Sequence, residues 1–326
     1  MATCCARILF ATVIGTGAAV SSAARAETCP PLQIVASVPM SYDFVGRPLV
    51  PVTLGTMRTL MLIDTGGAFS TIAPQAVEAL GLGRRRVEVR QYGVSGRYTD
   101  EATDVSPFVL GNLVADRIQL MIDLDNPEFD GTHIAGIIGP NILHNYDAEF
   151  DFGTNTFRLL SQNHCPGQVI YWPATNAAEI PVEITKDIGH IVVPVTLDGV
   201  HLRALIDTGA GISFMPSRVA EDRFGLSLDT RQERRGIAPA WVHMHRFHVL
   251  SLEGIEVGNP PVDIIPDLLR RAMSAGPAMG TTLTFGGQPR GIPDISLGVD
   301  VLKHLHLYIA YKEQMLYATP ARVAGP

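Results

Sequence analysis

Residues 62–67 read LIDTGG, and residues 205–210 read LIDTGA. Each stretch places the tripeptide Asp-Thr-Gly at the end of an apolar run that has the pattern of a β-strand. A chain of this length contains one such tripeptide by chance on the order of a few per cent of the time. Two copies in matched surroundings therefore indicate a repeated structural unit.

The similarity between the two halves extends well beyond these tripeptides. VPVTL precedes both, at residues 50–54 and 193–197, and 143 residues separate both the VPVTL runs and the Asp-Thr-Gly runs. Downstream, GIIGPNIL at 136–143 corresponds to ISLGVDVL at 295–302, where the separation has grown to 159. The second copy therefore carries an insertion, which we place at the Gly- and Pro-rich residues 273–293. A repeat this long indicates a duplicated domain, with two lobes that each have their own core.

The composition is that of an ordinary globular protein. The chain has 326 residues, of which 46% are hydrophobic and 17% charged, enough to bury a substantial core. Its formal charge is −7, and it has no long basic run. Nucleic acid and anionic membrane surfaces are therefore not expected partners.

Residues 1–26 have the features of a secretory signal peptide. Arg7 precedes an apolar stretch at 8–20, and Ala24-Arg25-Ala26 offers a cleavage site before Glu27. The stretch is too short to span a bilayer as a mature helix. We expect an exported protein, periplasmic or secreted, without membrane attachment after cleavage. An uncleaved anchor or a disordered start is the alternative.

Cleavage would leave two cysteines, Cys29 and Cys165. An exported protein meets an oxidising compartment, so a disulfide between them is one outcome. It also requires the two residues to meet within the short reach of disulfide geometry, and the sequence leaves this open.

The apolar runs within each half are short, β-branched and broken by turn residues, which predicts a mostly β protein. The predicted strands include residues 48–54, 59–63, 105–110 and 117–122. A short helix is predicted after each Asp-Thr-Gly strand, at 74–80 and at 217–224. Ser217 is the expected N-cap of the second, and Gly81 and Gly225 are expected to end the two helices.

The same patterns predict the boundaries along the chain. Residues 161–179 lack regular periodicity and are rich in Pro, Gly, Asn and Gln, as in a linker. The predicted segments are therefore 1–26 (signal peptide), 27–47 (N-terminal segment), 48–160 (first lobe), 161–179 (linker) and 180–320 (second lobe).

Two facing carboxylates are able to hydrolyse a peptide bond, because one activates a water molecule while the other polarises the carbonyl. Carboxylates a few ångströms apart cannot both ionise cheaply, so the pair shares one proton. Gly66 and Gly209 would permit a close approach of backbone to the carboxylates. Thr65 and Thr208 offer hydroxyls that can form hydrogen bonds across a symmetric interface.

These residues resemble those of the aspartic proteases, and in detail the retropepsin-like branch. The DTGA form at Asp207 and the run at 137–143 carry the resemblance, which covers most of residues 48–160 and 180–318. It implies a bilobal acid-protease fold, with two homologous β-barrel-like lobes and the active site in the cleft between them. Because both copies lie in one chain, it implies a pepsin-like arrangement with Asp64 and Asp207 as the catalytic dyad. Thr65, Gly66, Thr208 and Gly209 would support them, without a cofactor.

Residues 91–96, QYGVSG, look like the flap of pepsin, a hairpin whose tyrosine closes over bound peptide. The resemblance implies that Tyr92 and Gly93 contact substrate and exclude water. Alternatively, Tyr92 is a hairpin aromatic that packs across a strand.

The residues after the two tripeptides depart from the pepsin pattern. Pepsin-like enzymes usually have Ser or Thr there, whereas this chain has Gly67 and Ala210. Fewer hydrogen bonds to the ionised carboxylate leave the lower pKa of the pair less depressed. We therefore expect a mildly acidic pH optimum.

Two histidine pairs, His243 with His245 and His304 with His306, are spaced to share a strand face. Without a carboxylate or cysteine cluster nearby in the sequence, we expect no metal site there.

Together with the signal-peptide pattern, the resemblance implies an exported, monomeric aspartic endopeptidase that acts on a peptide or protein substrate. The alternative is a peptide-binding or regulatory module of the same fold that turns over slowly or not at all, since fold alone does not establish activity. The two intact aspartates favour the enzyme. A third hypothesis is that two chains pair and the dyad forms between molecules.

Overall fold

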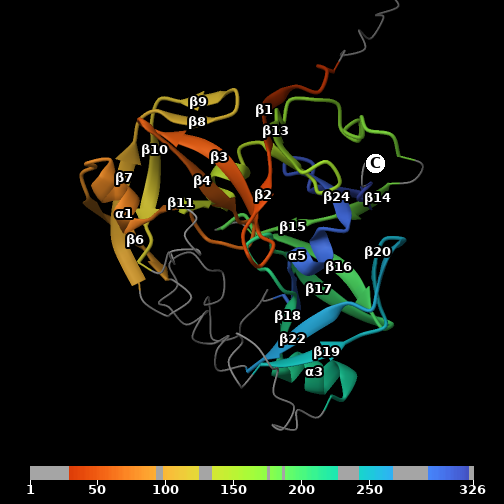
Figure 1. The fold of residues 1–326 in the computed structure, drawn as a ribbon. Helices are drawn as coiled ribbons and strands as arrows, with labels where there is room; N and C mark the ends of the chain where they lie inside the picture. The colour runs from red at the N-terminus through yellow and green to blue at the C-terminus, as the bar shows by residue number, and fades with distance from the viewer. Residues whose placement is uncertain are drawn as a thin grey trace, which may run out of the picture.

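The computed structural model of the protein describes residues 29–92, 98–124, 134–174, 177–185, 188–226, 242–266 and 293–322. In these ranges the protein is mostly β, as the sequence predicts, and its strands form three sheets. Figure 1 shows one group of strands from the first half, in orange to yellow, and another from the second half, in green to blue. This is the predicted two-lobed arrangement.

The first sheet comes entirely from the first half of the chain. Its strands are β2 (Ser41–Tyr42), β3 (Pro48–Leu54), β4 (Met57–Ile63), β5 (Thr71–Ile72), β6 (Arg85–Tyr92), β7 (Tyr98–Val105), β8 (Phe108–Leu110), β9 (Leu113–Ala115), β10 (Ile118–Ile122) and β11 (Ile134–Ile138). They are ordered β6-β7-β10-β5-β11-β4-β3-β8-β9, with β2 paired to β3 outside this order. The strand that leads into Asp64, β4, runs parallel to β11, with Ile63 opposite Ile138.

The second sheet repeats this order from β7 onward with strands from the second half, and its described residues include no counterpart of β6. Its strands are β15 (Glu183–Ile184), β16 (Ile191–Leu197), β17 (Val200–Ile206), β18 (Phe214–Pro216), β19 (His243–Arg246), β20 (Val249–Leu252), β21 (Ile255–Gly258), β22 (Pro261–Ile265) and β23 (Ile295–Leu297). They are ordered β19-β22-β18-β23-β17-β16-β20-β21, with β15 paired to β16. Here β17 takes the place of β4 and runs parallel to β23, with Ile206 opposite Leu297.

The third sheet combines the two halves. Its strands are β1 (Ile34–Pro39), β12 (Asp147–Asp151), β13 (Thr156–Leu160), β14 (Ala178–Pro181), β24 (Leu305–Ala310) and β25 (Met315–Pro320). The order β1-β13-β12-β24-β25-β14 takes three strands from each half and joins them at the antiparallel pair β12 and β24. β1 and β14 thus occupy equivalent positions at the two edges of this sheet.

Four helices are present in the described residues: α1 (Pro74–Ala79), α2 (Pro140–Leu143), α3 (Ser217–Phe224) and α5 (Val299–Leu302). As predicted, α1 and α3 follow the Asp-Thr-Gly strands. Gly225 closes α3 in the left-handed region at φ 64°, and Gly81 follows α1 at φ 60°. The prediction that Ser217 is the N-cap was wrong. The chain is still extended at Pro216, the N-cap, and no side chain caps the helix.

The predicted strands differ from the observed ones mainly at Pro107. The strand at 48–54 is confirmed, and those predicted at 59–63 and 117–122 differ from β4 and β10 by one or two residues at their starts. The single strand predicted at 105–110 was wrong, because β7 ends at Val105 and β8 begins at Phe108. Pro107 has no N–H to donate and therefore interrupts the ladder.

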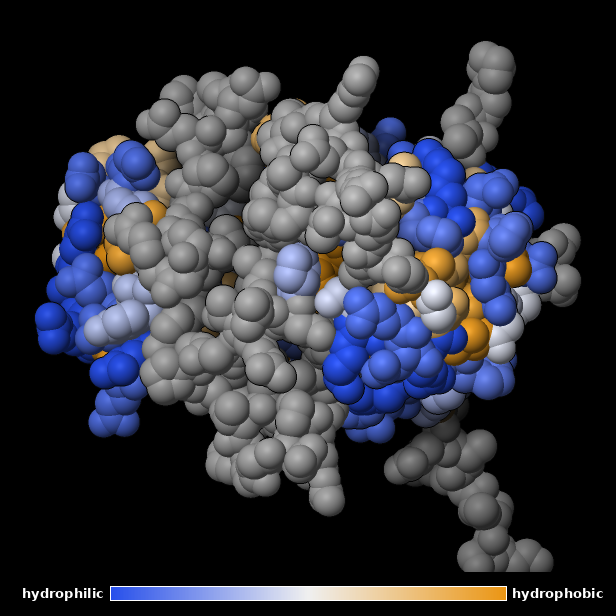
Figure 2. Space-filling model, turned by 90° about the horizontal axis from the view of Figure 1, so that it is seen from below, coloured by the Kyte–Doolittle hydropathy of each residue, from blue (hydrophilic) through white to orange (hydrophobic). Residues whose placement is uncertain are grey.

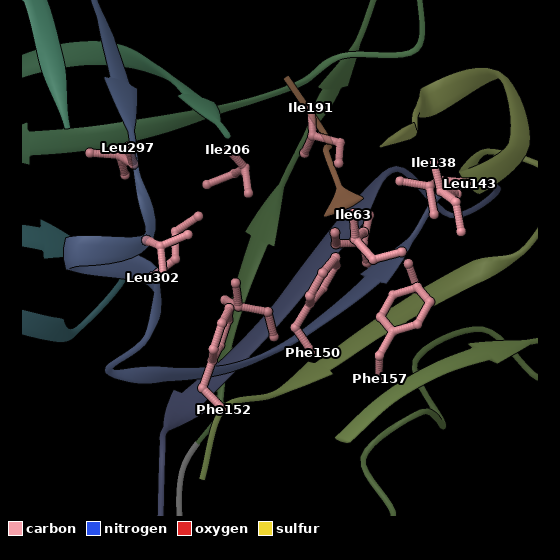
Figure 3. Close-up of a cluster of buried hydrophobic side chains, with 14 of the residues drawn as sticks. Ile63, Ile138, Leu143, Phe150, Phe152, Phe157, Ile191, Ile206, Leu297 and Leu302 are labelled. Carbon is pink, nitrogen blue, oxygen red and sulfur yellow. The ribbon is translucent and has the colours of Figure 1, made fainter. Parts of the chain in front are cut away.

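The largest cluster of buried hydrophobic side chains runs through both halves. In Figure 3, Ile63 and Ile206, the last residues of the two strands that lead into Asp-Thr-Gly, lie in the same cluster as Phe150 and Leu297. The expectation of a separate core for each lobe was therefore wrong. The third sheet joins the halves edge to edge, so that its apolar residues continue from one half into the other.

Cys29 is exposed and Cys165 is half-buried, and both carry free thiols, so the structure contains no disulfide between them. Of the helices described, none has the length and apolar character needed to cross a bilayer. Hydrophilic residues cover most of the described surface on the face in Figure 2, with smaller hydrophobic areas between them.

Candidate active site

The two Asp-Thr-Gly turns meet where β4 and β17 end. The N–H of Asp64 donates to the carbonyl of Ile138 at 3.0 Å, and the N–H of Asp207 donates to the carbonyl of Leu297 at 3.0 Å. Each aspartate is thus fixed by the strand that runs parallel to its own. Both come from one chain, so the dyad does not require a second molecule.

The two threonines exchange hydrogen bonds between the halves. The hydroxyl of Thr65 donates to the carbonyl of Ile206 at 2.7 Å and accepts from the N–H of Thr208 at 3.1 Å. The hydroxyl of Thr208 does the same in return, with the carbonyl of Ile63 at 2.7 Å and the N–H of Thr65 at 3.1 Å. Both threonines are completely buried. Four hydrogen bonds in a dry interface therefore hold the two turns in register.

Two glycines allow the carboxyls to come together. A Cβ at Gly66 would collide with the carboxyl of Asp207, and a Cβ at Gly209 would collide with the carboxyl of Asp64. Each carboxyl thus lies against the glycine of the opposite turn. Any side chain at these two positions would push the aspartates out of place, which gives Gly66 and Gly209 a steric reason to be glycine.

Backbone N–H groups bind both carboxyls. The N–H groups of Gly66 and Gly67 each donate to Oδ1 of Asp64 at 2.8 Å. Asp207 receives hydrogen bonds from the N–H groups of Ala210 and Gly209, and these lower its pKa. The supporting atoms are thus backbone amides, as the lack of a hydroxyl after each tripeptide requires.

The surroundings keep one proton on the pair. Desolvation, and then repulsion from Asp64, raises the pKa of Asp207 to about 8. Desolvation also raises the pKa of Asp64, but the N–H groups of Gly66 and Gly67 and the charges of His190 and Arg47 oppose this rise. Asp64 is therefore the carboxyl that ionises first, and Asp207 is the one that keeps the proton toward neutral pH.

Each turn is backed by a serine and a polar residue that the sequence analysis did not single out. The hydroxyl of Ser70 donates to Oδ1 of Asn141 at 2.8 Å and accepts from the N–H of Gly139 at 2.9 Å. In the second half, the hydroxyl of Ser213 donates to Oδ1 of Asp300 at 2.7 Å and accepts from the N–H of Gly298 at 2.9 Å. The signal was in the repeat, since these residues occupy equivalent positions in the two copies.

Two further residues near the dyad were missed. Arg47 donates from Nη1 to the carbonyl of Gly209 at 3.4 Å, and His190 makes a hydrogen bond from Nε2 to the carbonyl of Gly67 at 2.9 Å. Each side chain crosses from its own half to the turn of the other. Neither belongs to a motif that sequence alone connects with the dyad.

The hairpin predicted as a flap is present in its strands. Tyr92 is the last residue of β6 and is paired with Tyr98, the first residue of β7. The side chain of Tyr92 and all of Gly93 lie outside the described residues, so their contact with substrate stays a prediction.

Among the residues that the structure describes, no group of three or more His, Cys, Asp or Glu is placed to hold a metal ion. His243 and His245 lie on β19, as the strand pattern predicts. His304 precedes β24, whereas His306 is buried in it and contacts Glu149 at 2.8 Å. The expectation that His304 and His306 share a strand face was therefore wrong.

Comparison with known proteins agrees with this geometry. A family model described as aspartyl protease matches residues 50–142 and 193–301, which include both aspartates. The crystal structure of basic 7S globulin from soybean has the same fold, with a TM-score of 0.51 at 10% identity over 91% of this chain and 98% of that one. No curated protein matches the sequence. Since the family model covers more than half of its length, the chain belongs to the aspartyl protease family.

Proposed function

We propose that this protein is an exported, monomeric aspartic endopeptidase, which hydrolyses peptide bonds with a water molecule held between Asp64 and Asp207. One observation carries the proposal: each carboxyl lies against the glycine of the opposite turn, so the two acids occupy one small site and share a proton. This is the arrangement that simultaneous base and acid catalysis requires. No cofactor takes part.

In the first step, the ionised carboxylate of Asp64 takes a proton from the water. The water oxygen forms a bond to the carbonyl carbon of the peptide, and the proton of Asp207 passes to the carbonyl oxygen. The product is a neutral tetrahedral diol, and the charge has moved from Asp64 to Asp207. Each proton travels within a preorganised site, which lowers the cost of the transfer.

In the second step, the diol collapses. Ionised Asp207 takes a proton from one hydroxyl, the C–N bond breaks, and Asp64 gives its proton to the leaving nitrogen. A carboxylic acid and an amine leave, and the pair returns to its starting charges. The raised pKa of both aspartates suits them to exchange protons in this way at mildly acidic pH.

Export rests on the signal-peptide pattern of residues 1–26, which lie outside the described residues. The monomer is supported by the origin of the site, since one chain supplies both turns and all four hydrogen bonds of the threonine exchange.

The proposal is tested with an unbiased peptide library, incubated with the purified protein between mildly acidic and neutral pH. We expect cleavage that a peptide with a hydroxyethylene group in place of the scissile amide inhibits, because that group mimics the tetrahedral diol. The cut sites give the specificity in the same experiment. Retention of peptides without any cleavage would contradict the enzyme and support the peptide-binding module.

The pH dependence of cleavage provides a second prediction. Since the mechanism needs one proton on the pair, we expect activity to be highest at mildly acidic pH. It is expected to fall as the pH rises through about 8, where Asp207 loses its proton. A profile of kcat/KM against pH measures how activity changes on the acidic and on the basic side of the optimum. An optimum as acidic as that of a gastric enzyme would contradict the prediction.

A further inference from the structure

Arg47 and His190 occupy equivalent positions in the two halves. They are separated by 143 residues, the same distance that separates Asp64 from Asp207. Each follows a glycine in the left-handed region, Gly46 at φ 89° and Gly189 at φ 80°. The duplication thus placed a permanently charged residue at one position and a titratable residue at the other.

The contacts of His190 fix its role more closely. A carbonyl oxygen only accepts, so Nε2 of His190 must carry the proton in its 2.9 Å bond to Gly67. The N–H of the same Gly67 donates to Oδ1 of Asp64 at 2.8 Å. Two bonds to the Thr185 hydroxyl and N–H, both 3.0 Å, anchor the His190 backbone. The imidazole of His190 is therefore linked to the carboxylate of Asp64 through the backbone of Gly67.

We propose that His190 is a positioning residue of the dyad. Its imidazole holds Gly67 against Asp64 from the opposite half, and its charge sets the pH at which the site loses activity in acid. This inference rests on the proposed function, because it concerns the regulation of the same site.

The charge effect follows from the signs of the two groups. Burial lowers the pKa of His190, and desolvation raises the pKa of Asp64, which brings the two ionisations toward the same pH range. As the pH falls, an imidazolium that forms beside Asp64 favours its ionised state. Asp64 then stays ionised, and therefore active as a base, to a lower pH than it would beside a neutral residue.

Few other charged groups of the described residues lie near His190 and Asp64. Asp64 is the charged group that interacts with His190, and Arg47 and Asp207 are the other charged groups near Asp64. Arg47 is itself paired with Asp43 at 2.6 Å. His144 lies near the His190 segment, but its Nδ1 is bonded to a carbonyl of α2 at 2.6 Å.

Three variants separate the positioning effect of the His190 side chain from the effect of its charge. His190→Gln keeps an N–H donor without a titratable charge, His190→Arg gives the donor a permanent charge, and His190→Ala removes both. His304→Gln, which changes an exposed histidine, is the matched control. For each protein, kcat and KM are measured across the pH range. Carboxyl protonation is followed separately by infrared or ¹³C NMR titration, which does not require activity.

We expect His190→Ala to lower kcat about tenfold with little change in KM, because the turn that holds Asp64 is displaced. His190→Gln is expected to recover most of kcat but to move the acidic limb to higher pH by about 0.5 to 1 unit. His190→Arg is expected to move it to lower pH by a similar amount. The carboxyl titrations are expected to shift in the same directions.

A purely structural role would leave the acidic limb and the carboxyl titration of the Gln and Arg variants where they are in the unchanged protein. That result, or shifts of both variants in the same direction, would overturn the inference while leaving the proposed function intact. If the unchanged protein cleaves no peptide, the proposed function fails, and the carboxyl titrations still decide whether His190 controls Asp64.

Discussion

Replacing Asp207 by asparagine is expected to abolish cleavage and yet to stabilise the folded protein above neutral pH. Activity falls at least about 10³-fold, because the asparagine cannot give a proton to the carbonyl oxygen or take one back. Asp64→Asn is expected to cause a loss of the same size, since it removes the base. Both losses are measured as kcat/KM on a peptide selected from the library.

The stabilisation follows from the pKa of Asp207. In the folded protein it lies at about 8, whereas an aspartate in the unfolded chain titrates near pH 4. The stability that this group contributes is therefore complete below pH about 4 and is lost as the pH rises through about 8. Asparagine has no charge to bury. The free energy of unfolding of the asparagine variant should therefore exceed that of the unchanged protein. The difference should grow between pH about 4 and pH about 8, where it reaches on the order of a few kcal/mol.

Asp198→Asn is a control, because the pKa of Asp198 is lowered whereas that of Asp207 is raised. Burial is the largest single effect and raises the pKa of Asp198. The hydrogen bonds from the N–H groups of Val249 and His248 and from the His248 side chain together outweigh it, so that the pKa is lowered. Its stability is present above pH about 4 and is lost in acid, so asparagine there should bring no gain at pH 8. Denaturant unfolding at pH 5 and pH 8 measures both. Equal differences at the two pH values for Asp207→Asn would contradict a buried shared proton.

The second large effect is expected from Thr65→Val, a change that keeps the shape of the side chain and removes its hydroxyl. The N–H of Thr208 and the carbonyl of Ile206 then lose their partners in a fully buried interface. Leaving two buried polar groups unsatisfied costs about 2 to 4 kcal/mol. We expect a clear fall in Tm and, because the turns are no longer held in register, a loss of kcat. Thr208→Val should behave in the same way.

Thr103→Val is the matched control. Thr103 is as buried as Thr65, but its hydroxyl makes one hydrogen bond, to the carbonyl of exposed Gly83 at 2.8 Å, which water can replace. We expect a cost of about 1 kcal/mol and no change in kcat. Thermal unfolding that gives the same cost for Thr65→Val and Thr103→Val would show that the exchange between the turns is no stronger than an ordinary side-chain bond.

The parts of the fold that could be predicted from sequence are those that local chemistry determines. Strand β3 and helix α3 have the predicted bounds, because a short apolar run specifies the strand and a terminal glycine ends the helix. The break at Pro107 was visible as a proline but was outweighed by the apolar residues around it. The third sheet could not be predicted, because its joining pair, β12 and β24, brings together strands about 160 residues apart in sequence.

The candidate site divides in the same way. Asp64, Asp207 and the two threonines could be predicted, because the short run that contains them occurs twice in the sequence. Asn141 and Asp300 lie in repeated runs too, but their role depends on which serine each one faces. His190 was the hardest to find, because its partner Gly67 is 123 residues earlier and is bound through its backbone. Only the fold reveals a contact of that kind.

The joining of β12 to β24 has a mechanical consequence. Four residue pairs, from Ala148 with Ile309 to Asp151 with His306, connect the halves as neighbouring strands of one sheet. Moving the two halves apart would break the pairing of β12 with β24 and expose the apolar side chains on both sides of this junction. On the proposed function, a substrate therefore enters while the two halves stay joined through this pairing.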